Sequence, residues 1–310
     1  MSNQKDIDQK KFYSELKYPG PRSSLTYLWA KRMSKYFKSN QEFTILDAGC
    51  GSGNDLCAIL DYFKNCKGIG IDQSKPSLDM LKKRSDIMGL SNRLKIVNQS
   101  YLKDFTIEDK ADIAIAIGTI GHSSNPDLAL KNILKNIKKG GLVGLMLYSD
   151  FGTYEKNKII DAINILSPES DDEFIKFVYS FEEKYPMYYY QSIHKNITRL
   201  KNFISHYIRR LFRNKSYGYL ASLPKDTIYK DAYITKIEKS FSFEEIESLL
   251  ETNNLEIIEF YSLGKINKKD IPKKWIKKWE NLSYLDKAKV SSLINFNPTS
   301  WSVMTRKKSD

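Results

Sequence analysis

Apolar runs alternate with helix-like segments through the first half of the chain. Between the runs, apolar residues recur at three- and four-residue spacing, which predicts helices at about 54–64, from Ser74 onward and at 126–138. Repeated units of this kind predict an α/β fold with a mostly parallel sheet and helices on both faces. The runs themselves are typical of strands buried on both faces and lie at 43–48, 67–72, 94–98, 111–117 and 142–147.

Breaker residues predict where several helices begin and end. Tyr18-Pro-Gly-Pro21 separates a polar arm or partial helix over residues 1–16 from a helix that Ser23 or Ser24 can cap and that runs to about Phe37. Lys138-Lys-Gly-Gly141 predicts a glycine C-cap for helix 126–138.

The strand and helix rhythm is interrupted at residues 149–240, which look helical with few strand signals. Ser242-Phe-Glu-Glu245 then matches a capping box that opens a further helix. Strand-like runs follow at 255–260 and 301–305. The sheet is therefore expected to be completed only by the last part of the chain.

The first strand runs directly into a glycine turn, Leu46-Asp-Ala-Gly-Cys-Gly-Ser-Gly53. Glycine lets the backbone turn sharply and approach a ligand closely, and a helix starting near Asn54 aims free N–H groups at that ligand. Asp72 ends the second strand 21 residues after Gly51, near the roughly 20-residue spacing at which a carboxylate grips a ribose. The pattern indicates a nucleotide-type ligand.

Two common nucleotide sites are disfavoured by the spacing of the loop. Dinucleotide binding requires Gly-x-Gly-x-x-Gly, whereas this loop is Gly-x-Gly-x-Gly with Asn at position 54. A phosphate-binding loop requires Gly-Lys-Ser/Thr, which does not follow here.

The glycine loop together with Asp72 resembles the S-adenosylmethionine (SAM) site of class I, Rossmann-like methyltransferases. The resemblance implies that Gly49, Gly51 and Gly53 form the loop under the cofactor and that Asp72 binds the ribose hydroxyls. It also places Asp47 near the methionine amino group, with Cys50 and Gln73 beside them. It further implies a terminal antiparallel hairpin.

The family's strand order divides the chain into four parts. These are an N-terminal helical cap (1–40), a SAM-binding core (41–148), a helical lid for substrate (149–240) and a C-terminal completion of the sheet (241–310) with a basic insertion at 262–298.

Loops after the third and fourth strands extend the expected cofactor site to Ser100, Tyr101 and Gly118. Many family members carry an acidic residue at the position of Ser100, where it binds the adenine amino group. A serine hydroxyl or a backbone group can replace that contact here, and Ser100 is equally compatible with an ordinary loop residue.

Three residues at the ends of the fourth and fifth strands are candidates for catalysis. Ile117–Pro126 resembles the "Leu-His-His … Pro" stretch of small-molecule methyltransferases and keeps His122, which can serve as a general base or simply pack within its loop. Tyr148 can contact substrate or belong to the core, and Asp150 is a weaker candidate base.

Further segments resemble a bacterial methyltransferase group that is sometimes fused to tetratricopeptide repeats. The segments are Tyr18-Pro-Gly-Pro-Arg-Ser23, Gly144–Ser149 and Lys230-Asp-Ala-Tyr-Ile234. The usual "His-Pro" or "His-Val" of that group is Thr235-Lys236 here. On this resemblance Tyr18, Arg22, Asp231 and Tyr233 are candidate substrate-binding residues.

Composition changes the picture in one respect, the net charge of +13 over 310 residues. Segment 191–216 holds seven Lys or Arg and no acid on an amphipathic helical pattern, and 265–289 holds nine basic and three acidic residues. Such segments are compatible with RNA, an anionic surface or a solvated lid. A lysine-rich coding bias is the simpler interpretation.

No apolar run reaches 18 residues and the N-terminus is polar, so a soluble cytoplasmic protein without a transmembrane segment is expected. The three cysteines, Cys50, Cys57 and Cys66, lack metal-ligand spacing, and no metal site is predicted.

The sequence therefore predicts a SAM-dependent methyltransferase that releases S-adenosylhomocysteine and acts on a small-molecule or peptide/protein acceptor. Two alternatives stay open. One is a tRNA or rRNA methyltransferase that grips phosphates with segments 191–216 and 265–289. The other is a non-catalytic SAM-binding partner protein. The acceptor, the methylated atom and the oligomeric state are not defined by the sequence.

Overall fold

The structure is a computed structural model that describes residues 4–16, 18, 25–184, 225–261, 271–293 and 300–308. Within these ranges the α-helices are α1 (Gln4–Leu16), α2 (Leu28–Met33), α3 (Asn54–Tyr62), α4 (Lys75–Ile87), α5 (Pro126–Lys135), α6 (Asp150–Ile165), α7 (Asp171–Lys184), α10 (Lys225–Ile234), α11 (Phe243–Thr252), α12 (Ile276–Asn281) and α13 (Tyr284–Leu293). The strands are β1 (Phe43–Ala48), β2 (Cys66–Asp72), β3 (Leu94–Asn98), β4 (Ala111–Ile117), β5 (Ile137–Ser149), β6 (Ser240–Phe241), β7 (Leu255–Phe260) and β8 (Ser300–Lys307).

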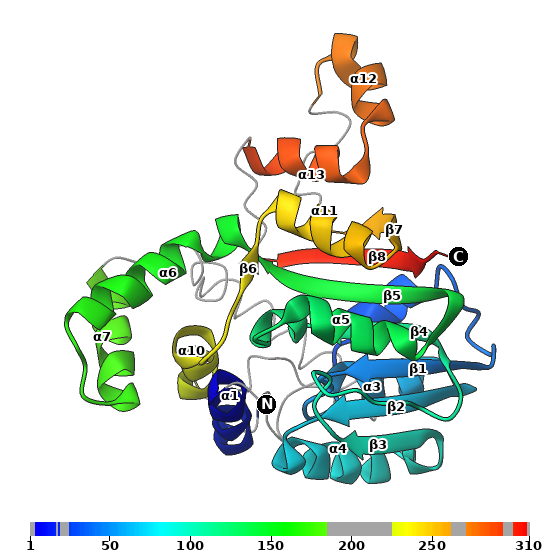
Figure 1. The fold of residues 1–310 in the computed structure, drawn as a ribbon, viewed down its shortest axis with the longest axis horizontal. Helices are drawn as coiled ribbons and strands as arrows, with labels where there is room; N and C mark the ends of the chain where they lie inside the picture. Colours follow the sequence, from blue (N-terminus) through cyan, green and yellow to red (C-terminus); the bar gives the residue numbers. More distant parts are fainter. Residues whose placement is uncertain are drawn as a thin grey trace, which may run out of the picture.

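The strands of the described chain form one sheet in the order β3-β2-β1-β4-β5-β8-β7, with short β6 paired to the end of β5. Strands β1 to β5 run parallel to one another, whereas β8 runs antiparallel to both β5 and β7 (Figure 1). The predicted parallel α/β sheet with a closing antiparallel pair is confirmed. Because the parallel strands point the same way, their carboxyl ends meet at one edge, where such sheets bind ligands.

Helices cover both faces of this sheet and bury two apolar clusters. One cluster joins the sheet to α5 and α11 and includes Leu130, Ile246 and Trp301. The other joins it to α2, α3 and α4 and includes Met33 and Leu81. The sheet is held rigidly from both sides, so the loops at its carboxyl edge start from fixed positions.

A third apolar cluster lies beyond the carboxyl edge and is built from helices far apart in the sequence. Phe12 of α1 packs with Ile163 of α6, Val178 of α7 and Tyr229 of α10. Figure 1 shows these four helices grouped to one side of the sheet. The N-terminal helix therefore joins the helices that follow β5 instead of standing as a separate arm.

The end of α5 differs from the prediction. Asn136, not the glycine pair after it, is the C-cap, and the Lys138–Gly141 stretch already lies within β5. The Asn136 side chain accepts from the Ile107 N–H and donates to the carbonyl oxygens of Phe105 and Asn132. These bonds to a distant loop end the helix early, and a local pattern does not reveal them.

Helix α2 is also shorter than predicted. It begins at Leu28 and ends at Met33, with turns continuing to about Phe37. Ser23 and Ser24, the predicted caps, lie outside the described residues. The predicted capping box of α11 is confirmed, because Ser242 Oγ accepts from the Glu245 N–H and the Glu245 carboxylate accepts from the Ser242 N–H.

The basic segments are only partly described. Segment 191–216 lies outside the described residues, whereas 271–289 forms a short 3₁₀ turn followed by α12 and most of α13. Helix α13 contacts α11 and β7, and Figure 1 shows α12 beyond it, farther from the sheet. None of the helices in the described ranges is both long and apolar enough to cross a bilayer.

Candidate active site

A cavity of about 400 Å³ opens at the carboxyl edge of the parallel strands. The glycine loop, the end of β2 and the loop after β4 form one part of its wall. Helices α1, α2 and α10 supply much of the rest, through Gln9, Tyr13, Trp29, Arg32 and Asp231. The cavity is therefore enclosed both by the sheet edge and by helices that lie far apart in the sequence.

The glycine loop has the backbone conformation that its sequence predicts. Gly49, Gly51 and Gly53 have φ of +79°, +51° and +77°, a region that residues with a Cβ rarely adopt. A Cβ on Gly49 would lie 2.3 Å from Thr119 Cγ2, and one on Gly53 would lie 2.2 Å from Leu81 Cδ1. Gly49 and Gly51 line the cavity. Gly53 does not; it is the N-cap of α3 and lies against Leu81.

Asp72 fastens this loop to the end of β2. Its Oδ2 accepts from the Gly51 N–H at 2.9 Å and its Oδ1 accepts from the Ser74 N–H at 2.7 Å. Burial raises the pKa of Asp72, while the N–H groups of Ser74, Gly51 and Gln73 oppose that rise. The carboxylate also lines the cavity, so its remaining lone pairs can accept from a ligand.

Four other predicted cofactor residues line the cavity, namely Cys50, Gln73, Tyr101 and Gly118. Tyr101 donates its hydroxyl to the Thr119 carbonyl at 2.9 Å and so presents its ring rather than its hydroxyl hydrogen. Burial raises the pKa of the Cys50 thiol well above its ordinary value, so this sulfur stays protonated and acts as a small wall residue.

Besides Gly53, two of the predicted cofactor residues do not reach the cavity wall. Asp47 is buried within β1, where burial and the neighbouring Asp55 and Asp72 raise its pKa. Ser100 uses its hydroxyl to accept from the Leu102 N–H at 3.2 Å. Ser100 therefore does not line the cavity, and its side chain is not positioned there for the predicted adenine contact.

The wall carries two charged groups that the sequence prediction missed, Arg32 on α2 and Asp55 in the first turn of α3. Arg32 Nη1 and Asp55 Oδ1 are both buried without a hydrogen-bond partner among the described residues. The guanidinium lies 4.2 Å from the Tyr261 ring centre. Burial raises the pKa of Asp55 to about 7, although Arg32 draws it down.

Buried polar atoms without a hydrogen-bond partner are costly, and here the two lie on residues that line the cavity, where a ligand could satisfy them. A cation and a carboxylate on one wall match the two charges of an α-amino acid. The only sequence signal was the place of Asp55 just after the glycine loop; Arg32 gave none, because its neighbours resemble any surface helix.

His122 stands at the other end of the site, in a 3₁₀ turn after β4. Its Nδ1 lies 2.7 Å from the Ile237 carbonyl oxygen, and a carbonyl can only accept, so Nδ1 carries the proton. In the neutral ring Nε2 is then the proton acceptor. Gly121 allows this contact, because a Cβ there would lie 2.8 Å from the Lys239 carbonyl oxygen.

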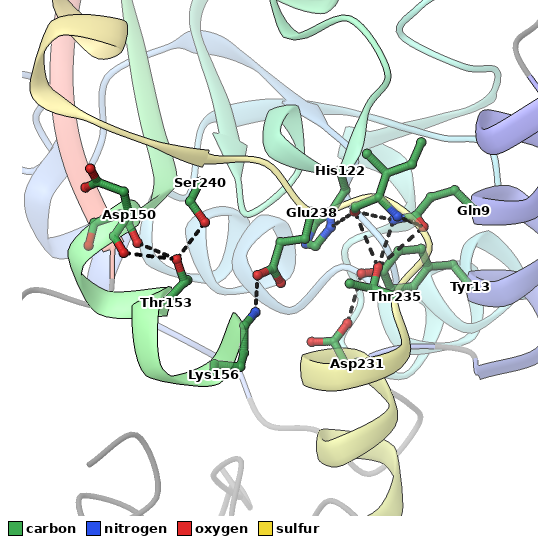
Figure 2. A network of polar contacts seen from close by, with 12 residues as sticks. Gln9, Tyr13, His122, Asp150, Thr153, Lys156, Asp231, Thr235, Glu238 and Ser240 are labelled. Atoms are coloured by element: carbon green, nitrogen blue, oxygen red, sulfur yellow. Dashed lines mark hydrogen bonds and ion pairs between the residues drawn. The ribbon is translucent and has the colours of Figure 1, made fainter. Parts of the chain in front are cut away.

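Gln9 of α1 holds the same segment in place and was not predicted. Its Oε1 accepts from the N–H groups of Lys236 and Ile237, and its Nε2 donates to Thr235 Oγ1 and the Ile237 carbonyl (Figure 2). The side chain is 1% exposed. One carbonyl, that of Ile237, thus joins α1 to His122.

Tyr13 and Asp231 form a second polar pair beside His122. Tyr13 donates its hydroxyl to Asp231 Oδ1 at 2.9 Å. Burial and the charge of Asp231 raise the pKa of Tyr13 well above its ordinary value, so the phenol stays a donor. The His122 ring lies between the rings of Tyr13 and Tyr148, with centroids 5.8 and 5.4 Å away. Tyr18 and Tyr148 also line the cavity.

An ion pair lies just outside this cluster. Lys156 of α6 bonds to Glu238, and their side chains are only 3% and 9% exposed. The lysine ammonium is also 5.8 Å from the Tyr148 ring centre. Figure 2 shows the pair next to His122 and Asp231. Because Lys156 pairs with Glu238, it does not form an ion pair with Asp231.

Two predicted catalytic or substrate residues lie away from the cavity wall. Asp150 begins α6 and its Oδ1 accepts from the Phe151 N–H at 2.8 Å. Tyr233 is buried in the cluster of α1, α7 and α10. Arg22 lies outside the described residues. Of the substrate candidates, Tyr18 and Asp231 reach the cavity. Throughout the described ranges, no three His, Cys, Asp or Glu side chains gather as metal ligands would.

The strand order, the antiparallel closing pair and the glycine loop with its acidic residue define the Rossmann-like fold of class I methyltransferases. The family of methyltransferase domains matches residues 39–283, and the chain belongs to it.

Known proteins resemble this chain over different extents. PKMT2 of Rickettsia typhi, solved with AdoHcy, superposes on 94% of this chain and 55% of its own with a TM-score of 0.66 at 17% identity, which is a likeness of fold. Human tRNA N(3)-cytidine methyltransferase METTL6 is 28% identical over 41% of this chain and 47% of its own. A probable (S)-tetrahydroprotoberberine N-methyltransferase of Papaver bracteatum is 28% identical over 29% of this chain.

The matched regions thus span 47% and 25% of these two curated relatives. The names of these relatives specify different acceptors, a tRNA cytidine and a tetrahydroprotoberberine.

Proposed function

We propose that this protein transfers a methyl group from SAM to a small-molecule or peptide/protein acceptor and releases S-adenosylhomocysteine. The observation that carries the proposal is a cavity lined both by the glycine loop, which Asp72 holds in place, and by Arg32 and Asp55, of which the atoms Nη1 and Oδ1 have no hydrogen-bond partner among the described residues. A ribose with two hydroxyls and an amino acid with two charges are the parts that SAM would place against these groups.

The residues divide between the two ends of such a cofactor. Gly49 and Gly51 let the backbone approach it, and Asp72 accepts from its ribose hydroxyls. Arg32 binds its carboxylate and Asp55 its ammonium group. When bound, SAM supplies a methyl group already made electrophilic by the sulfonium. The chain therefore needs to exclude water, align the acceptor and receive a proton.

His122 is the group best placed to receive that proton. Its Nδ1 is engaged with the Ile237 carbonyl, so Nε2 is the available acceptor on a ring that lines the cavity. Tyr13 and Tyr148 hold the ring on both sides. The alternative role for His122 is simply to pack within its loop. A measurement of methyl transfer distinguishes a proton acceptor from a packing residue.

The experiment that tests the proposal is calorimetric titration with S-adenosylhomocysteine, followed by labelled-methyl transfer from SAM to pools of acceptors. We expect binding that Asp72→Ala weakens at least tenfold, because the variant loses the ribose acceptor and the latch on Gly51. Asp79→Asn is the matched control, because Asp79 is an exposed residue of α4, and it should bind like the wild type.

The outcomes of the titration and of the transfer assay distinguish the three candidate functions. No binding by the wild type would sink the proposal. Binding without transfer to any acceptor would favour the non-catalytic SAM-binding protein. Transfer to RNA that is lost at high salt, or in Arg209→Glu/Arg210→Glu, would favour the RNA enzyme. Membership in the bacterial group sometimes fused to tetratricopeptide repeats, and a cytoplasmic location, remain predictions.

A further inference from the structure

The end of the cavity around His122 has an unusual composition for a site that handles neutral or anionic acceptors. Aromatic rings of Tyr13, Tyr18 and Tyr148 line it together with the His122 ring. The Tyr13 and Tyr18 centroids are 6.4 Å apart, and His122 lies between Tyr13 and Tyr148. Aromatic rings stabilise cations through their π-electrons, particularly where water is excluded.

Asp231 adds a carboxylate to this aromatic end. Its Oδ1 accepts from Tyr13, while no lysine or arginine of the described chain lies within ion-pair distance of it. Burial raises the pKa of Asp231, and the charges of His122 and Lys156 oppose that rise over a longer range. Of these two, Lys156 is paired with Glu238. A carboxylate removed from water without a paired cation is costly, so a cationic ligand would be strongly favoured here.

Two proton acceptors therefore face the cavity at one end. One is the carboxylate of Asp231, of which Tyr13 occupies a single oxygen, and the other is Nε2 of His122, since Nδ1 is held by Ile237. A nucleophile that suits both must bring at least two hydrogens. A hydroxyl group brings one, and a carboxylate brings none and would be repelled by Asp231.

We propose that the acceptor is an amine that enters as an ammonium ion, held by Asp231 and the tyrosine rings. The inference rests on the proposed function, of which it names the acceptor class. The ammonium gives one proton to His122 Nε2, and the freed nitrogen lone pair forms the new N–C bond with the methyl carbon. The C–S bond breaks with its electron pair left on sulfur, the methylated amine leaves as a cation, and His122 passes its proton to solvent.

The test uses the full-length protein saturated with S-adenosylhomocysteine, so that binding is measured without turnover. Three probes of one shape and different charge are titrated near pH 7: 2-phenylethylammonium, 2-phenylethanol and phenylacetate. We expect the cation to bind at least tenfold more tightly than either of the others. Asp231→Asn should reduce that affinity tenfold or more, because a charge-assisted hydrogen bond is lost.

Asp161→Asn is the matched control, since Asp161 is exposed on α6 and outside the cavity; it should leave the affinity for the cation unchanged. Equal or tighter binding of the alcohol or of phenylacetate would overturn the proposal. So would absence of cation binding, or cation binding that Asp231→Asn does not weaken, in protein that still binds S-adenosylhomocysteine. Loss of S-adenosylhomocysteine binding by the wild type would instead overturn the proposed function itself.

A second measurement covers the case in which Asp231→Asn disturbs folding. Tyr13→Phe keeps the carboxylate and removes only the hydroxyl that donates to Oδ1. The variant should retain the preference for the cation over the alcohol, because Asp231 keeps its charge. If the preference disappears with the carboxylate still present, then Asp231 is not its source.

Discussion

The two ends of the cavity are built in different ways. The glycine loop and Asp72 lie 21 residues apart and are joined by one hydrogen bond. At the His122 end, Gln9 contacts Ile237 across 228 residues and Tyr13 contacts Asp231 across 218. The first arrangement is local, so its sequence pattern identifies it. The second arrangement forms only when the chain folds, so no sequence motif identifies the residues at this end.

The contrast between the two ends of the cavity leads to a first prediction, which concerns His122 as the proton acceptor. His122→Asn should reduce methyl transfer by about 10²–10⁴-fold, because the amide can still donate to the Ile237 carbonyl but offers no basic nitrogen. Affinity for S-adenosylhomocysteine should stay within about twofold, because the cofactor end is separate. Transfer is followed with labelled SAM and an acceptor on which the wild type is active.

A companion variant separates chemistry from packing. His122→Gln places its amide near the old Nε2 position and gives up the bond to Ile237. It should also lose transfer, with a melting temperature a few degrees below that of the asparagine variant. Full transfer by the asparagine variant would assign His122 to packing alone.

The second prediction concerns the cofactor end. Gly49→Ala should weaken S-adenosylhomocysteine binding by about 10²-fold, since φ is +79° and the new Cβ would meet Thr119. Gly140→Ala is the control, with φ of +71° and nothing within 4 Å of the added Cβ. It should lose about 1 kcal/mol of stability and bind normally. Calorimetry and thermal melting measure the pair, and equal binding by both variants would contradict the prediction.

The third prediction is a pH dependence of cofactor binding. The pKa of Asp55 is about 7, and the ionised form is the one that pairs with an ammonium group. A proton must therefore leave before binding, so affinity should fall as pH drops below about 7, by up to about tenfold per unit. Asp55→Asn should bind more weakly at pH 8 and lose this slope. An identical slope in the variant would exclude Asp55 as its origin.

Arg32 provides a complementary check on the same wall. Arg32→Gln should weaken S-adenosylhomocysteine binding about tenfold or more through the lost charge-assisted bond to a carboxylate. Lys31→Gln, at the exposed neighbouring position of α2, should bind normally. A decarboxylated analogue of the cofactor should lose little affinity in Arg32→Gln. If it loses as much affinity as S-adenosylhomocysteine does, then Arg32 does not bind the carboxylate.

The smallest effect is expected from the contact between α1 and the segment after α10. Gln9→Ala leaves the N–H groups of Lys236 and Ile237 without their acceptor and should lower transfer about tenfold, because Ile237 orients His122. Binding of S-adenosylhomocysteine should not change. Gln4→Ala, exposed on the same helix, serves as the control. A drop in cofactor affinity as large as the drop in transfer would show that the two ends are not separable.

Local signals predicted much of the fold. Strands 43–48, 94–98, 111–117 and 255–260 have the predicted bounds, because continuous apolar runs bounded by turns leave few alternatives. The end of α5 was wrong, since Asn136 is fixed by partners about 30 residues away. Gln9, Tyr13 and Arg32 were missed for the same reason: their roles depend on which distant segments the fold brings together.

The Gln9 contact also bears on the order in which the molecule is completed during synthesis. The bonds of Gly51 to Asp72 and of Thr119 to Ala48 span 21 and 71 residues, so the ribosome has released both partners early. The Gln9–Ile237 contact cannot form until 228 residues after Gln9 have been synthesised. Long-range closures of this kind form slowly. A nascent chain thus possesses its glycine loop well before it possesses a pocket for an acceptor.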